Sequence, residues 1–107
     1  MITRLVEYSE NGTVYIGREG RGEHGYFGNP HVVGRYCALC EIIHLDNVAA
    51  VAAFQTTFDQ RIVNDKIFRR RVLELKGQAL WCPGRCVGAG KPCHGQVYIA
   101  WLEAQPL

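Results

Sequence analysis

Hydrophobic residues in the N-terminal part of the chain gather in short stretches that are typical of β-strands. Residues 1–8 and 13–17 are rich in β-branched and aromatic side chains, and Asn11-Gly12 between them is a common turn sequence. The pattern predicts two strands or a hairpin. A glycine-rich loop follows over residues 17–34, and loops of this length inside compact domains are uncommon and usually functional or mobile.

The middle of the chain carries two helical patterns, each preceded by an aspartate that can cap the first turn. After Asp46, apolar residues recur at three- and four-residue spacing to about Val63, which predicts a helix with one buried face. The positions expected on that face are Val48, Val51, Gln55, Phe58 and Ile62, all of them apolar except Gln55. After Asp65 a second helix is expected to end at Gly77, a favourable residue beyond a helix C-terminus. Its expected buried residues are Phe68, Val72 and Leu75, and its outward residues are Arg69, Arg70, Arg71 and Glu74.

The C-terminal part predicts a buried strand over residues 78–82, a loop over 83–92 and a helix over 95–103. The residues expected to be buried on this last helix are Val97, Ala100 and Trp101. Together the elements predict an α/β fold. We expect a small single-layer sheet packed by helices, with a C-terminal strand–loop–helix unit, in one domain covering residues 1–107.

Composition adds expectations about compartment and class. The chain has 107 residues, of which 48% are hydrophobic, and a formal net charge of +2, a balance that neither requires nor excludes a nucleic-acid partner. No apolar stretch approaches the length of about 20 residues that spans a bilayer, and the N-terminus does not resemble a signal peptide. We therefore expect a cytoplasmic protein without membrane contact, in the host cytoplasm if a phage encodes it. The five cysteines are then expected to be thiols or metal ligands rather than disulfides.

Two cysteine pairs suggest a structural zinc site. Cys37 and Cys40 form a Cys-x-x-Cys knuckle, and Cys82 and Cys86 form a second pair with one more intervening residue. Four thiolates from two such pairs make a closed tetrahedral site. The residues that could replace one of these ligands are Cys93, His94 and His44. The alternative is that the first pair is inert and only structural.

A second candidate site lies where the last helix begins, at Cys93-His94-Gly95. Ligands of open α/β sheets bind beyond the carboxyl ends of strands, where helix N-termini present N–H groups. A thiol there can become a nucleophile and a neighbouring histidine can act as acid–base group or ligand, so Cys93 and His94 are the catalytic candidates. The alternative is that Cys93 fills the core and His94 caps the helix.

Two basic stretches allow further interpretations. Arg69-Arg70-Arg71 could contact nucleic-acid phosphates, but we favour a solvated helix face because no aromatic or basic partner run accompanies it in the sequence. The glycine-rich loop beginning at Gly17-Arg18 could hold an anion or could be only a flexible tip; it matches neither the Walker nor the dinucleotide pattern.

Three segments taken together resemble a known family. They are residues 14–18 (Val-Tyr-Ile-Gly-Arg), residues 28–30 (Gly-Asn-Pro), and residues 73–83 with Pro92-Cys93-His94-Gly95. The pattern resembles a small bacterial and phage family known only as domain of unknown function number forty-three twenty-six. The resemblance implies a compact α/β domain of phage or prophage origin, without an established activity. The shared positions are Tyr15, Gly17, Arg18, Gly28, Asn29, Pro30, Trp81, Cys82, Cys93, His94 and Gly95.

The chain also departs from that family pattern. Leu80 stands where the family has its first cysteine and Gln96 where it has an aspartate, which puts any mechanism using that carboxylate in doubt. The additional residues between Cys82 and Cys93 bring Cys86, and the Cys37–Cys40 pair is a further addition. These paired additions support a zinc ion held by Cys37, Cys40, Cys82 and Cys86.

The leading functional hypothesis is binding of a phosphate-bearing small molecule, such as a nucleotide, at loops 17–30 and 83–95. The expected binding residues are Tyr15, Arg18, Gly28, Asn29, Pro30, His94 and Gly95. One alternative is a zinc-stabilised module that binds a host protein or other host macromolecule; another is a nucleic-acid binder acting through Arg69–Arg71. Whether the protein is an enzyme stays open, and an enzyme of this kind would act on nucleotides or nucleosides through Cys93 and His94.

Overall fold

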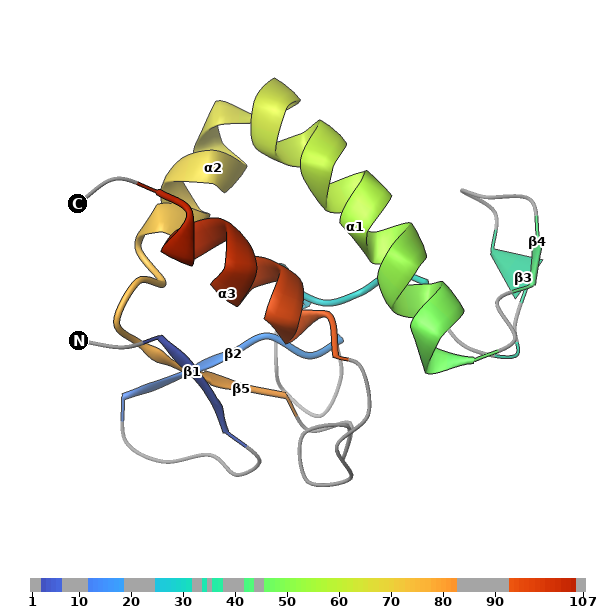
Figure 1. The fold of residues 1–107 in the computed structure, drawn as a ribbon, viewed down its shortest axis with the longest axis horizontal. Coiled ribbons are helices and arrows are strands. Elements are labelled where there is room, and N and C mark those ends of the chain that lie inside the picture. The colour runs from blue at the N-terminus through green and yellow to red at the C-terminus, as the bar shows by residue number, and fades with distance from the viewer. Residues whose placement is uncertain are drawn as a thin grey trace.

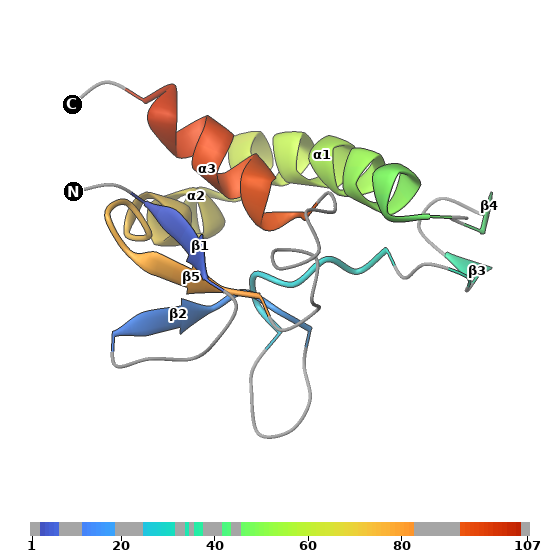
Figure 2. The ribbon, with the colours of Figure 1, turned by 60° about the horizontal axis from the view of Figure 1, so that its bottom comes forward.

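The protein has two layers, a small parallel sheet and a group of helices on one side of it (Figures 1 and 2). The computed structural model describes residues 3–6, 12–18, 25–31, 34, 36–37, 42–43, 46–82 and 93–105. Helices α1 and α3 form the helical layer, and the short α2 packs against both. This arrangement confirms the predicted α/β fold and its C-terminal strand–loop–helix unit.

The sheet consists of β1 (Arg4–Val6), β2 (Thr13–Tyr15) and β5 (Ala79–Trp81). Strand β5 lies in the middle and pairs in parallel with both others, so that Leu80 stands between Leu5 and Val14. The two N-terminal strands were expected either as a hairpin or as separate strands, and the hairpin is wrong because β1 and β2 run in the same direction on opposite sides of β5. The most apolar strand takes the central place, as is usual in parallel sheets.

Two aspartates begin the first two helices as the sequence predicts. Helix α1 (Asn47–Asn64) starts where Asp46 Oδ1 accepts a hydrogen bond of 2.8 Å from the Ala49 N–H group. Helix α2 (Lys66–Leu73) starts where Asp65 Oδ1 accepts from the Phe68 N–H group at 3.0 Å. Helix α2 was expected to continue to Gly77 but ends at Leu73, because residues 74–77 form turns. Gly77, the last residue of these turns, has a φ of 80°.

The buried faces of α1 and α3 differ in part from the predicted ones. On α1 a four-residue repeat of buried side chains runs Ala50, Phe54, Phe58, Ile62. Val48 and Gln55 lie off this row and are exposed, Val48 to 63%, so their predicted place on the buried face is wrong. Helix α3 (Gly95–Glu103) begins and ends as expected, and its buried residues are Gly95, Val97, Tyr98 and Leu102. Ala100 is exposed and Trp101 half-buried, because the apolar residues of α3 nearly surround the helix and their spacing does not single out one face.

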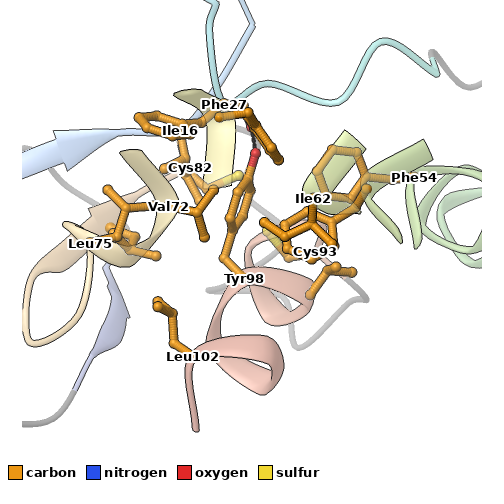
Figure 3. Packing of buried hydrophobic residues seen from close by; sticks show 14 residues of the cluster. Ile16, Phe27, Phe54, Ile62, Val72, Leu75, Cys82, Cys93, Tyr98 and Leu102 are labelled. Atoms are coloured by element: carbon orange, nitrogen blue, oxygen red, sulfur yellow. Dashed lines mark hydrogen bonds between the residues drawn. The ribbon is translucent and has the colours of Figure 1, made fainter. Parts of the chain in front are cut away.

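Aromatic rings fill the core between the helices and the sheet (Figure 3). Tyr98 projects from α3 into this core, and its hydroxyl group donates a 2.9 Å hydrogen bond to the carbonyl oxygen of Phe27. Burial raises the pKa of Tyr98 well above its ordinary value, so the hydroxyl group remains a donor throughout the physiological range. This bond fastens the described part of the glycine-rich loop to the last helix.

A second, separate strand pair was not predicted. It consists of β3 (Tyr36–Cys37) and β4 (Ile42–Ile43), which are antiparallel. The pair lies beyond the N-terminal end of α1, apart from the three-stranded sheet in both views (Figures 1 and 2). Within the described residues, no helix combines the length and the apolar character that crossing a bilayer requires.

Candidate functional site

The candidate site lies where the central strand of the sheet ends and the last helix begins. Cys82 follows β5 directly, and its N–H group donates to the Val6 carbonyl oxygen at 3.3 Å, which extends the pairing by one residue. Cys93 and His94 stand immediately before α3. The carboxyl end of the central strand and the N-terminus of the helix after it therefore meet, as the sequence predicts for this unit.

Two thiols and one imidazole come together at this junction. The ligand atoms of Cys82, Cys93 and His94 all lie within 4.8 Å of one another, and all three residues are buried. A tetrahedral zinc ion has Zn–S distances of about 2.3 Å and Zn–N distances of about 2.0 Å, which place its ligand atoms about 3.5–3.8 Å apart. Side-chain adjustments of about 1 Å would therefore bring these atoms to the separations of a zinc site.

A hydrogen bond fixes which nitrogen of His94 can bind. The Nε2 atom lies 2.6 Å from the carbonyl oxygen of Ile16, and a carbonyl oxygen can only accept, so Nε2 carries the proton. The lone pair is then on Nδ1, which is 3.9 Å from the Cys93 sulfur. Burial lowers the pKa of His94, partly offset by the hydrogen bond to Ile16, so the ring is neutral near pH 7. Carbonyl groups orient metal-binding histidines in this way.

The start of α3 acts on Cys93 through the backbone. The N–H group of Gly95 donates to the Cys93 sulfur at 3.4 Å, and the Cys93 N–H group donates to Gln96 Oε1 at 3.2 Å. The two contacts resemble a capping box. Cys93 thus occupies the capping role that the alternative interpretation gave to His94, whose side chain forms no capping bond. A helix N-terminus favours negative charge, which suits a metal-bound thiolate.

Gly95 lets the helix approach the sheet closely. A Cβ atom at this position would overlap Leu5 Cδ2 and would lie 2.8 Å from Ile16 Cδ1. The expected role of Gly95 was a ligand contact through its N–H group, but that group already donates to Cys93. The absence of a side chain at Gly95 is instead explained by packing against β1 and the end of β2.

Arg18 and the Gly-Asn-Pro segment form a neighbouring network. Arg18 donates from Nε to the Asn29 carbonyl oxygen at 2.9 Å and from Nη2 to the His31 carbonyl oxygen at 3.2 Å. The Tyr15 hydroxyl group donates to the carbonyl oxygen of Arg18 at 2.5 Å. Arg18 is exposed at the surface, and Pro30 is exposed beside it. The network positions Arg18 firmly and leaves other N–H groups of its guanidinium group uncommitted within the described structure.

Asn29 and Gly28 have structural roles in that segment. Asn29 is buried; its Nδ2 donates to the Ala50 carbonyl oxygen at 3.2 Å, and its Oδ1 accepts from the His31 N–H group at 2.8 Å. A Cβ atom at Gly28 would lie 2.6 Å from the Gly17 carbonyl oxygen, a backbone atom that has little freedom to move. Both residues therefore hold the loop against α1 and the end of β2.

The predicted zinc ligands are only partly described. Of the four predicted cysteines, Cys82 lies close to Cys93 and His94, which the sequence allowed as substitute zinc ligands. The strand that carries Cys37 lies apart from the end of β5 in both views (Figures 1 and 2). Cys40, Cys86 and His44 lie outside the described residues, so the four-cysteine set stays a prediction. As catalytic candidates, Cys93 and His94 are adjacent but buried, with 3% and 8% of their surface exposed.

Comparison with known proteins gives a family but no activity. No curated protein and no solved structure matches the chain. One family pattern matches residues 4–104, which is nearly the whole chain and includes every residue of the thiol–imidazole cluster. The protein therefore belongs to the family described as Domain of unknown function (DUF4326).

Proposed function

We propose that this protein is a zinc-binding domain in which Cys82, Cys93 and His94 hold the ion. The observation that carries the proposal is the convergence of two sulfur atoms and one imidazole nitrogen within 4.8 Å in the protein interior. Sulfur and imidazole nitrogen are the donors that zinc prefers. The Ile16 carbonyl oxygen supports the same assignment, because it keeps the proton of His94 on the nitrogen that faces away from the Cys93 sulfur.

The burial of all three side chains favours a structural role for the ion over a catalytic one. A bound zinc ion would supply two positive charges that balance two thiolates, and it would link the end of β5 to the start of α3. Cys86, four residues after Cys82, is the sequence-based candidate for a fourth ligand. Thiolate ligands require a reducing compartment, which supports the further proposal of a cytoplasmic protein, in a host cell if a phage encodes it.

Zinc content measured on substituted proteins tests the proposal. Protein purified under reducing conditions without chelator should contain about one zinc ion per chain by native mass spectrometry, as for a closed structural site. Cys82→Ser, Cys93→Ser and His94→Gln should each reduce this content to near zero. Removal of any one of the three ligands leaves too few donors to hold zinc tightly.

The matched control is Cys37→Ser, which removes a cysteine from the separate β3–β4 pair and should leave zinc content unchanged. Loss of zinc in Cys37→Ser would instead favour the four-cysteine set. Wild-type protein that neither contains zinc nor takes it up when zinc is added would rule out both versions. Far-UV circular dichroism of each variant separates metal loss from general unfolding.

A second candidate function, binding of a phosphate-bearing small molecule such as a nucleotide, is supported by Arg18. Its side chain is held at two points by main-chain carbonyl groups yet remains exposed, which prepares the remaining N–H groups for an anion. Arg18 follows Ile16 by two residues, and the carbonyl oxygen of Ile16 accepts the hydrogen bond from His94, which links the two candidate sites along the chain. In this proposal Tyr15 and residues 28–30 position Arg18 rather than contact the ligand.

Isothermal titration with ATP tests the second candidate. Arg18→Gln should weaken binding about tenfold, the loss expected for one charge-assisted hydrogen bond. Arg4→Gln, at another exposed arginine on the edge of the sheet, serves as the control and should leave the affinity unchanged. Equal affinities in wild type and Arg18→Gln, or no binding to wild type, would count against a phosphate site at Arg18.

A further inference from the structure

Positive charge is concentrated in one short segment of the chain. Residues 61–76 contain six of the twelve basic residues but only two of the ten acidic ones, which gives this segment a net charge of +4. The whole chain has a net charge of +2, so the remaining residues together carry −2. A long anionic partner would therefore be attracted to this segment more strongly than to the rest of the chain.

Helix α2 presents this charge at the surface. Phe68 and Val72 are buried and hold the inner face of the helix against the core. The basic residues of α2 are all exposed; they are Lys66, Arg69, Arg70 and Arg71. The helix lies beside the C-terminal half of α3, whereas the thiol–imidazole cluster lies at its N-terminal end (Figure 1). The basic face is thus separate from the metal centre.

Aromatic rings support two of these arginines. The guanidinium carbon of Arg69 lies 5.2 Å from the ring centre of Trp101, and that of Arg71 lies 5.2 Å from the ring centre of Tyr26. Both rings are half-buried. Both rings come from parts of the sequence far from α2. The sequence around Arg69–Arg71 contains no aromatic run, which argued against nucleic-acid binding, but the fold brings aromatic rings to these arginines. An arginine held over a ring loses less freedom when it binds an anion.

Two further cations on the same helix have no such support. The side chains of Lys66 and Arg70 form no hydrogen bond, ion pair or ring contact with any described residue, and Glu74 is the acidic residue that follows them at the end of the helix. Unpaired cations next to prearranged ones suit a ligand with repeated negative charges. A phosphodiester chain has one such charge on every nucleotide.

We propose that the outer face of α2, formed by Lys66, Arg69, Arg70 and Arg71, binds the phosphate backbone of a nucleic acid. Planar guanidinium groups match phosphate oxygens at two points, as they also match carboxylates. The regular spacing of charge along a phosphodiester chain favours a nucleic acid over an acidic protein surface. Contacts of positively charged side chains with phosphates position a nucleic acid without reading its bases, so we expect binding that does not depend on base sequence.

Fluorescence anisotropy with labelled oligonucleotides tests the proposal on the zinc-loaded protein. Wild type should bind single strands or duplexes with a dissociation constant of about 1–100 μM at physiological salt, as non-specific binders do. Affinity should fall steeply as salt rises. Arg70→Ala should reduce the slope of log K against log salt by about 0.7 on a single strand or 0.9 on a duplex. Lys66→Ala combined with Arg70→Ala should double that reduction.

Arg4→Ala is the matched control, because it removes one exposed positive charge from the sheet and not from α2. It should leave the salt slope unchanged. Equal losses in Arg4→Ala and Arg70→Ala would overturn the assignment to α2, as would absence of binding at low salt. Polyglutamate that binds as tightly as the oligonucleotides, or binding that resists salt and depends on the exposed Ile67, would point to an acidic or apolar protein partner and overturn the proposal.

Discussion

Removal of the proposed zinc ion by a chelator should lower the midpoint of thermal unfolding of the wild-type protein by about 15 °C or more. An ion present at about 1,000 times its dissociation constant stabilises the folded state by about 4 kcal/mol. In a domain near 100 residues each kcal/mol shifts the midpoint by about 4–8 °C. The effect is large because the ion would join Cys82 to Cys93 and His94, which lie eleven and twelve positions further along the chain. Circular dichroism melts with and without chelator provide the measurement.

Cys93→Ser is the control for this experiment. The variant should melt at the lower temperature in both conditions, because it holds no ion that chelator can remove. A wild-type midpoint that chelator does not move, in protein shown to contain zinc, would mean that the ion lies elsewhere and does not stabilise the fold. Re-addition of zinc should restore the original midpoint.

Phe58→Ala should reduce the free energy of unfolding by about 3–5 kcal/mol, the range for removal of a buried phenylalanine ring. Phe58 is 1% exposed and stands at the meeting point of all three helices. Its ring centre lies 5.3 Å from that of Tyr98 on α3 and 5.9 Å from that of Phe68 on α2. Removing the ring leaves a cavity lined by aromatic groups that cannot move inward together. Urea unfolding followed by tryptophan fluorescence measures the loss.

Val63→Ala on the same helix is the control, since Val63 is 75% exposed and its change should stay within about 0.5 kcal/mol. If Phe58→Ala fails to fold, Phe58→Leu should still show a measurable loss, because leucine fills only part of the space. A loss below about 1 kcal/mol in Phe58→Ala would contradict the central packing role of this ring.

Local signals in the sequence predicted the helices better than the sheet. The Asp46 and Asp65 caps depend on side chains and N–H groups only three residues apart, and α3 begins and ends as expected. The pairing of β1 and β2 depends instead on β5, more than sixty residues later. The Asn11-Gly12 pattern indicates a turn but does not determine which strands lie together; Gly12 does adopt a positive φ of 83°.

The sequence predicted that the end of β5 and the start of the last helix meet, but as metal ligands Cys93 and His94 were considered only as substitutes. Spacing favoured Cys82 with Cys86, because short cysteine pairs are the usual indication of zinc. The structure brings Cys82 to Cys93 and His94 because the end of β5 and the start of α3 meet, although they are separated in the sequence. The roles of Asn29 and Gly28 were also missed. A buried amide that bonds the backbone of α1, and a glycine pressed against another backbone segment, become evident only from three-dimensional contacts.

The central position of β5 has a consequence for synthesis on the ribosome. Strands β1 and β2 leave the ribosome first, but neither can complete its pairing until residues 79–81 have emerged. Both strands therefore present unpaired edges during most of translation, when pairing with another chain is possible. Contacts between residues so distant in sequence also slow folding, because a long loop must close before the sheet forms. A nascent chain stalled before residue 79 should bind chaperones, whereas one that has released residue 105 should fold.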